Sequence, residues 1–390
     1  MAWWILLHAD RCRVTQCARA YRVRVGGTPP TRRALATVTG MSLHESMVLE
    51  ALGTVQDPEL HQDLVSLGMV DEVTIDGGVV HVTVNLTTPA CPMKAEIERD
   101  VKAAVGALPG VETIHLTFGA QVRGSEQPSL PGVKHVIAVG SGKGGVGKST
   151  VAANLAAGLA LEGASVGLLD ADIYGPSQAK MFSVEGKRLM ADGDKNILPL
   201  RNHGVKLVSV ANLVEDGQAL TWRGPILHGT LTQMLQQTVW GDLDYLIVDL
   251  PPGTGDVQLS LTQLANVTGA VLVTTPQEMS MVDVRRAYTM MRKTHVPVLG
   301  LVENMAWYAL PGGERDYIFG EGVGSAWAEA ERIAVLGQIP ISRRVRESGD
   351  SGTPIVIADP DSEQAQALRS AARVLAGQVS IQALNTLPVL

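Results

Sequence analysis

The chain has 390 residues, which favours at least two domains because domains cluster at about 100 to 200 residues. Its formal net charge of -7 argues against a nucleic-acid partner, which needs a basic surface. Three cysteines give no disulfide framework and no apolar run reaches the ~20 residues of a membrane span, so we expect a cytoplasmic protein without a membrane partner.

Residues 1–40 differ in composition from the rest of the chain. They contain seven arginines, one aspartate and no lysine, and we expect them to be a disordered basic extension. A sharper hypothesis places the natural start at Met41, because Ser42 and Glu45 then form a helix-opening capping box. The alternative is a genuine basic tail.

A small α+β domain is predicted for residues 41–122. Apolar residues recur at helical spacing over 43–55, and two runs that alternate with period two, joined by the turn Asp-Gly-Gly, predict a hairpin over 70–86. A second amphipathic helix is predicted over 93–108, followed by a strand over 111–118.

Residues 123–132, RGSEQPSLPG, are polar and broken by proline and glycine, which predicts a linker. Beyond it, continuous Val/Ile/Leu runs alternate with helical stretches, a pattern typical of a buried, mostly parallel sheet with helical crossovers. We therefore predict an α/β, doubly wound domain over 133–378 and a short tail over 379–390.

The run SGKGGVGKST follows the predicted strand VIAVG and precedes a good helix, which is the context that a phosphate-binding loop requires. Glycines let backbone N–H groups converge on phosphates, Lys148 faces the β and γ phosphates, and the Ser149 hydroxyl can ligate Mg²⁺. The predicted ATP-binding residues of this loop are Gly142, Lys143, Gly144, Gly145, Val146, Gly147, Lys148, Ser149 and Thr150.

Carboxylates end two further predicted strands. Asp249 closes DYLIVDL and opens the loop PPGTGD, which ends at Asp256; this is the expected place for a carboxylate that positions Mg²⁺ through water. Asp170 and Asp172 leave another strand together. We favour Asp172 over Asp170 for orienting the attacking water, although acids at strand ends are commonly structural.

Lys143 is a second lysine inside the loop, a charge that a single nucleotide site does not obviously need. With Lys143, KGGVGKS resembles the deviant Walker A motif of the SIMIBI ATPases, which include MinD, ParA and the nitrogenase iron protein. That resemblance implies a homodimer in which Lys143 reaches the partner's phosphates as a catalytic residue in trans.

A narrower resemblance covers residues 133–360. The strings LLDADIYGPS, DYLIVDLPPGTGD, VTTPQEMSMVDVRRA, GLVENMAWY and GQIPISRRVRESGDSGTP are similar, in this order, to the Mrp/ApbC iron–sulfur cluster carriers. The segment TTPACPM and its domain resemble the SufT/PaaD-type domain often fused to them. The resemblance implies ATP and Mg²⁺ as cofactors, client apoproteins and assembly factors as partners, and an adenine contact by Asn304, which from the residues alone would be a turn-capping asparagine.

The ligands that such carriers use are missing. Many relatives carry Cys-x-x-Cys just after the ENM segment, whereas this chain has Leu310 and Gly313 there and no cysteine after residue 91. Cys91 precedes a predicted helix, whose N-terminus would lower its pKa and favour a cluster-binding thiolate. The alternative is a small buried residue at a turn. We give little weight to Cys12 and Cys17.

The first interpretation is a homodimeric ATPase that carries and transfers iron–sulfur clusters, with slow hydrolysis coupled to cargo or client binding and with transient cluster binding. A MinD- or ParA-like positioning ATPase is disfavoured, because the last 30 residues contain only two arginines and no lysine. A cluster-free regulatory ATPase is the third candidate. Trp307, Tyr308 and Leu310 would supply packing surface for the dimer or a client.

Overall fold

The computed structural model describes residues 43–122, 124, 130–213, 224–253, 258 and 264–385. The predictions for the basic extension, for Cys12 and Cys17, for Asp256 and for most of the linker lie outside these residues.

The small N-terminal domain has the predicted helices and strands. Its elements are α1 (Glu45–Leu52), β1 (Val70–Asp76), β2 (Val79–Leu86), α2 (Lys94–Gly106) and β3 (Thr113–Ala120). The sheet has the order β1-β2-β3, with β1 antiparallel and β3 parallel to β2. Alternate residues of β2 and one face of each helix are buried in a single apolar cluster, as the two periodicities predicted.

The second part of the chain alternates strands and helices from residue 133 to residue 385. Its longer elements are β4 (Val133–Ser141), α3 (Lys148–Leu161), β5 (Val166–Asp170), β9 (Val205–Ser209), α5 (Gly224–Gln236), β10 (Leu243–Asp249), β11 (Gly269–Thr274), α7 (Glu278–Lys293), β12 (Val298–Ala309), α8 (Val323–Ala330), β14 (Val335–Ile341), α9 (Arg343–Asp350) and α11 (Glu363–Asn385). The short elements are α4 (Gln178–Met181), β6 (Met190–Ala191), β7 (Ile197–Leu198), β8 (Leu200–Asn202), the 3-10 helix Val210–Asn212, β13 (Arg315–Asp316) and α10 (Ile355–Ala358).

Within the described residues, nine strands form the central sheet, in the order β13-β12-β11-β4-β10-β5-β9-β8, with β14 also paired to β12. All its pairings are parallel except those of the two short edge strands β13 and β8. The parallel strands therefore present their carboxyl ends at one edge, where ligands bind in sheets of this kind.

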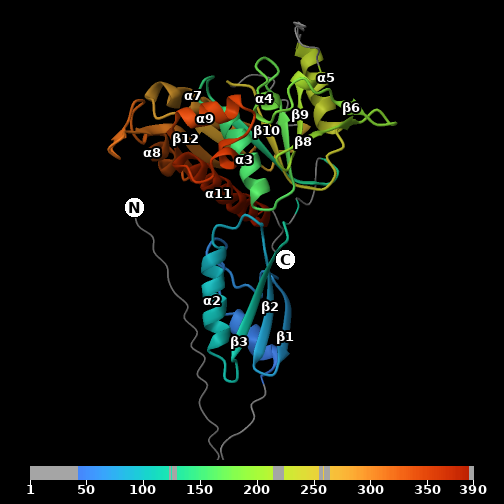
Figure 1. The fold of residues 1–390 in the computed structure, drawn as a ribbon, viewed down its shortest axis with the longest axis vertical. Helices are drawn as coiled ribbons and strands as arrows, with labels where there is room; N and C mark the ends of the chain where they lie inside the picture. The colour runs from blue at the N-terminus through green and yellow to red at the C-terminus, as the bar shows by residue number, and fades with distance from the viewer. Residues whose placement is uncertain are drawn as a thin grey trace, which may run out of the picture. The chain divides into compact units, whose positions relative to one another are not determined.

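Helices cover both faces of this sheet (Figure 1). α3, α10 and α11 pack over one large apolar cluster, and α5, α7 and α8 pack over two clusters of the opposite face. Strands buried on both sides explain the continuous apolar runs of the sequence. The predicted doubly wound α/β class is confirmed.

Several elements of the C-terminal part were not predicted, among them α8, α9, β14 and α11. β14 adds a parallel strand beside β12, and α11 runs on past residue 378, where the sequence analysis ended the domain, to Asn385. One side of α11, including Leu368, Ala372 and Leu375, is buried against α3 and β14. Among the described residues, no helix has both the length and the apolar content to cross a bilayer.

Candidate nucleotide-binding site

The loop between β4 and α3 has the backbone of a phosphate cradle. Gly145 and Gly147 have φ angles of 83° and 81°, in the left-handed region where a side chain is strained. Gly142 lies so close to α7 that an added Cβ would sit 2.3 Å from the backbone of Asp283. Helix α3 begins at Lys148, so its first N–H groups face the loop.

Lys148 joins the loop to two neighbouring strand ends. Its Nζ donates to Asp249 Oδ1 at 2.5 Å and lies 3.9 Å from Asp172 Oδ2. Asp249 is fully buried and Lys148 is 6% exposed, so this is an ion pair shielded from water. The sequence predicted that Lys148, Ser149, Asp172 and Asp249 share a site, and the structure brings them together.

Asp170 and Asp172 occupy different environments. Asp170 accepts hydrogen bonds from the Ser177 and Gln178 backbone N–H groups and from Ser209 Oγ, so its carboxylate anchors the start of α4. Asp172 borders the phosphate loop, accepts a hydrogen bond from the Gly175 N–H at 3.3 Å and lies beside the Lys148 ammonium. Asp172 is thus the acid of the two that lines the pocket of the phosphate loop, and its role toward water stays a prediction.

Burial raises the pKa of both carboxyls. Removal from water is the largest cause at Asp170, and the nearby charge of Asp249 acts in the same direction. At Asp172 burial again raises the pKa, while the Lys148 ammonium opposes the shift. A carboxyl with a raised pKa beside a phosphate cradle can accept a proton from water more readily than a free one.

Magnesium fits the donors of this site. Ser149 Oγ and the carboxylates of Asp172 and Asp249 are hard oxygen ligands, which Mg²⁺ prefers. In the part of the chain that the structure describes, no group of three His, Cys, Asp or Glu side chains could hold a metal alone. Mg²⁺ at phosphate sites takes most of its ligands from water and phosphate oxygens.

Lys143 points across the loop toward α7. Its Nζ donates to Gln277 Oε1 at 3.2 Å, and its carbonyl accepts from Ser141 Oγ at 2.9 Å. Gln277 is the N-cap residue of α7. Within one chain Lys143 is thus held at the rim of the site rather than beside Asp172 and Asp249.

Asn304 lies in the middle of β12, and its side chain braces the loop. Its Nδ2 donates to the Val146 carbonyl at 2.9 Å, and an added Cβ on Gly147 would lie 2.2 Å from the same Nδ2. The following residue, Met305, has a φ of 55°, which marks the irregular pairing of β12 with β14. Contact of Asn304 with adenine stays a prediction.

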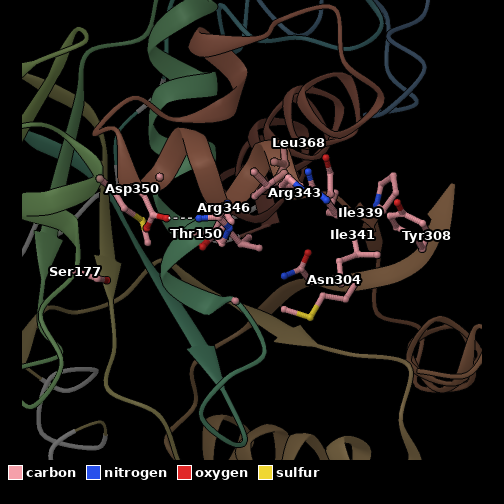
Figure 2. A pocket seen from close by; sticks show the side chains of 18 of the residues that line it. Thr150, Ser177, Asn304, Tyr308, Ile339, Ile341, Arg343, Arg346, Asp350 and Leu368 are labelled. Carbon is pink, nitrogen blue, oxygen red and sulfur yellow. Dashed lines mark hydrogen bonds and ion pairs between the residues drawn. The ribbon is translucent and has the colours of Figure 1, made fainter. Parts of the chain in front are cut away.

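A cavity of about 780 Å³ opens beside the phosphate loop, within the size range of small-molecule sites. It shares Gly147 and Thr150 with the smaller pocket, of about 210 Å³, that Lys148 and Asp172 line. Figure 2 shows its walls, which come from α3, α4, β12, β14, α9 and α11. The labelled lining residues are Thr150, Ser177, Asn304, Tyr308, Ile339, Ile341, Arg343, Arg346, Asp350 and Leu368.

Sequence reasoning missed most of this cavity. The segment ISRRVR contributes Ile341, Arg343 and Arg346, of which Arg346 pairs with Asp350 at 2.8 Å. This segment belongs to GQIPISRRVRESGDSGTP, one of the strings that resemble the Mrp/ApbC proteins. Its pattern of residue types, however, does not indicate that it lines a cavity. Its place follows from β14 pairing with β12.

The environment of Cys91 contradicts the prediction that the helix N-terminus lowers the pKa of its thiol. The thiol is 8% exposed, and burial together with the nearby carboxylates of Glu59 and Asp57 raises its pKa to about 11. The Met93 and Lys94 backbone N–H groups lower it, as a helix start should, but less than burial raises it. The predicted lowering of the pKa is wrong because desolvation outweighs the helix N-terminus. In this conformation Cys91 is a buried, protonated thiol.

The loop after β12, where the resemblance led us to look for cysteines, is a closed hairpin. β12 pairs antiparallel with β13, and the Leu310 N–H donates to the Glu314 carbonyl at 2.9 Å. The Arg315 guanidinium lies 4.0 Å from the centre of the Trp307 ring, and this ring is buried. The expectation that Trp307 supplies packing surface for the dimer or a client is therefore wrong. Tyr308 and Leu310 are 43% and 37% exposed.

A glycine-rich loop between a parallel strand and a helix, with a buried lysine and two strand-end aspartates, defines a P-loop nucleotide-binding protein. Residues 132–376 match the family profile described as NUBPL iron-transfer P-loop NTPase, of the ParA type. The chain belongs to this family. Residues 45–116 match a profile described as iron–sulfur cluster assembly protein, and the resemblance to Mrp/ApbC proteins with a fused small domain is confirmed.

Curated relatives span nearly the whole chain. It is 56% identical over 342 residues to a protein of Deinococcus radiodurans named iron-sulfur cluster carrier protein, covering 87% of this chain and 97% of that one. It is 41% identical to the protein of the same name from Escherichia coli K12, covering 86% and 92%. A nucleotide-binding protein of Archaeoglobus fulgidus solved with ADP has a TM-score of 0.52 at 40% identity, covering 59% of this chain and 90% of that one.

Proposed function

We propose that this chain is an ATP-binding and ATP-hydrolysing carrier that holds iron–sulfur clusters and transfers them to apoproteins in the cytoplasm. The observation that carries the nucleotide part is the buried Lys148–Asp249 pair beneath a phosphate loop that opens into a nucleoside-sized cavity. The proposal of cluster transfer is supported by relatives at 41% to 56% identity that bear the name of cluster carriers.

The roles of the site residues follow from their places. Lys148 binds the β and γ phosphates, for which it leaves its contact with Asp249. Bound Mg²⁺ would neutralise phosphate charge, with Ser149 Oγ as a ligand and Asp249 holding its water shell. Asp172 orients the attacking water. Asn304 lines the cavity and is proposed as an adenine contact.

A homodimer completes the proposed site. Among the described residues, Lys143 Nζ bonds to the neutral side chain of Gln277 and to no carboxylate, so no ion pair within them has to break when it reaches the partner's phosphates. Coupling of slow hydrolysis to dimer contacts would change the grip on cargo or client proteins. Exposed Tyr308 and Leu310 supply apolar surface beside the cavity.

The second part of the proposal concerns the thiolates that would hold the cluster. Iron–sulfur clusters need about four thiolates, and the hairpin after β12 offers none. Cys91 could ligate only after a rearrangement that exposes and ionises it, because burial raises its thiol pKa to about 11. A client's cysteines or a small thiol would then complete the set, which suits transient holding. The burial of Cys91 favours the second candidate, a cluster-free regulatory ATPase.

Anaerobic cluster reconstitution followed by transfer to a cluster-requiring apoenzyme tests the first candidate. Wild type is expected to take up iron and to activate the apoenzyme faster with MgATP than without it. Cys91→Ser tests the ligand, and Lys134→Ala is the matched control for Lys148→Ala, because Lys134 lies at the amino end of β4, away from the phosphate loop. Absence of iron uptake with normal ATP turnover would select the regulatory ATPase.

A further inference from the structure

Gln178 is a buried amide at the centre of the phosphate site. It is the first residue of α4 and is fully buried. Its backbone N–H donates to Asp170 Oδ2 at 3.0 Å, and Ser209 Oγ donates to the same oxygen at 2.9 Å. The carboxylate of Asp170 therefore fixes where the Gln178 side chain starts.

The Gln178 side chain bridges the two motifs that handle phosphate and Mg²⁺. Its Nε2 donates to Asp249 Oδ2 at 2.8 Å and to the Ser149 carbonyl at 2.9 Å. The reverse orientation of the amide would set Oε1 against two acceptors, so chemistry fixes which atom is which. With Lys148 on Oδ1, both oxygens of Asp249 have a donor.

The other end of the amide has no donor within the described residues. Gln178 Oε1 is buried and accepts no hydrogen bond. An unsatisfied buried acceptor costs about 1–3 kcal/mol, so its retention beside Ser149 and Asp249 points to a donor that arrives with the ligand. Mg²⁺ at a phosphate site keeps several of its waters, and each of these is a donor.

We propose that Gln178 is a positioning residue for Mg²⁺: it holds Asp249 at a fixed distance from Ser149 and accepts a hydrogen bond from a water in the Mg²⁺ shell. This inference rests on the proposed nucleotide-binding function. It implies that Gln178 sets the affinity for Mg²⁺ in the nucleotide complex and leaves the affinity for the nucleotide alone nearly unchanged. Outer partners of metal ligands typically contribute 10- to 100-fold in metal affinity.

Gln178→Met tests this, because methionine keeps the length and volume of the side chain and removes both polar atoms. ADP affinity is measured by calorimetry in EDTA and across a Mg²⁺ titration of the full chain. We expect ADP affinity in EDTA within about twofold of wild type and an apparent Mg²⁺ affinity lower by roughly 10- to 100-fold. Should the methionine variant not fold, Gln178→Asn, which is too short to bridge both acceptors, replaces it.

Asn212→Leu is the matched control. Asn212 is also a buried amide, with Nδ2 bonded to the Val184 and Lys187 carbonyls at 2.8 Å and with Oδ1 unpartnered, but it lies outside the phosphate loop. Its variant should lose stability and keep the Mg²⁺ titration of wild type. Unchanged Mg²⁺ affinity in the Gln178 variant, or an equal shift in the control, would overturn the inference. A wild type whose ADP binding ignores Mg²⁺ would instead defeat the proposed function.

Discussion

Replacing Lys148 by alanine should destabilise the protein before any nucleotide is added. The substitution leaves Asp249, fully buried, facing Asp170 and Asp172 without a cation. Breaking a buried pair by removing one partner costs about 3–5 kcal/mol. Because the Gln178 amide still donates to Asp249, we expect a loss at the low end of that range, about 3 kcal/mol.

The loss should also depend on pH. The Lys148 ammonium now lowers the pKa of Asp170 and Asp172 against the effect of burial, so its removal raises both further above their unfolded values. A carboxyl whose folded pKa is raised loses stability as pH rises from the unfolded pKa through the folded one. The variant should therefore lose more at pH 8 than at pH 5.

Urea unfolding in EDTA, followed by tryptophan fluorescence, measures this loss. No tryptophan lies between residues 43 and 122, and Trp240 is buried in the sheet domain, so the change in Trp240 emission reports the domain that holds Lys148. Lys134→Ala is the control: its pair with Asp244, at 2.8 Å, leaves the lysine 41% exposed and should contribute at most about 1 kcal/mol. A Lys148 loss no larger than that control, or equal at both pH values, would refute the reasoning.

Three further variants or reactions have defined outcomes. Gly147→Ala should weaken ATP binding at least tenfold by equilibrium dialysis, because its φ of 81° and the Asn304 amide leave no room for a methyl group; wild-type affinity would contradict this. Alkylation of Cys91 at pH 8, followed by peptide mapping, should be about 100-fold slower in the folded chain than in urea, since a pKa of about 11 leaves little thiolate; equal rates would be inconsistent with burial. Burial beside Asp57 raises the pKa of Glu59 to about 7, so stability falls as pH rises from the unfolded value to about 7; Glu59→Gln should raise the melting temperature at pH 8 and leave it unchanged at pH 4, and a rise at both would refute the assignment.

Local pattern was enough to predict elements whose burial is periodic or complete. The alternation in β2 and the continuous runs of β4, β10 and β11 each match the side of the sheet that they bury. β14 escaped prediction because VLGQIPI contains a glycine and a proline, yet it is admitted beside β12 at the edge of the sheet. Its pairing depends on contacts that no local pattern encodes.

The site was predictable where a motif fixes backbone and chemistry together. The loop glycines, Lys148 and Asp249 needed only their order along the chain, because carboxyl ends of parallel strands meet at one edge. Gln178 and Gln277 were not predicted as site residues, since a glutamine belongs to no motif recognisable in this sequence. Their roles follow only from the hydrogen bonds that their amides make in the folded chain. The Cys91 prediction failed for a related reason, because its helix start was visible and its burial was not.

Cysteines introduced into the hairpin after β12 would test whether the absence of thiol ligands there prevents cluster binding. Leu310 and Gly313 sit at the two ends of one turn, joined by the Gly313 N–H to Leu310 carbonyl bond at 2.9 Å, so cysteines there would be close neighbours. Gly313 has a φ of 85°, so Gly313→Cys should cost the apo protein about 1–2 kcal/mol whereas Leu310→Cys should cost little. Metal binding to preformed thiolates releases about 10 kcal/mol or more in small zinc sites, which exceeds that strain.

If the proposed homodimer brings two such turns together, the double variant should take up one cluster per dimer on anaerobic reconstitution, measured by iron content and visible absorption. Uptake no greater than that of wild type, from a variant that folds and binds ATP, would mean that the turns do not face each other.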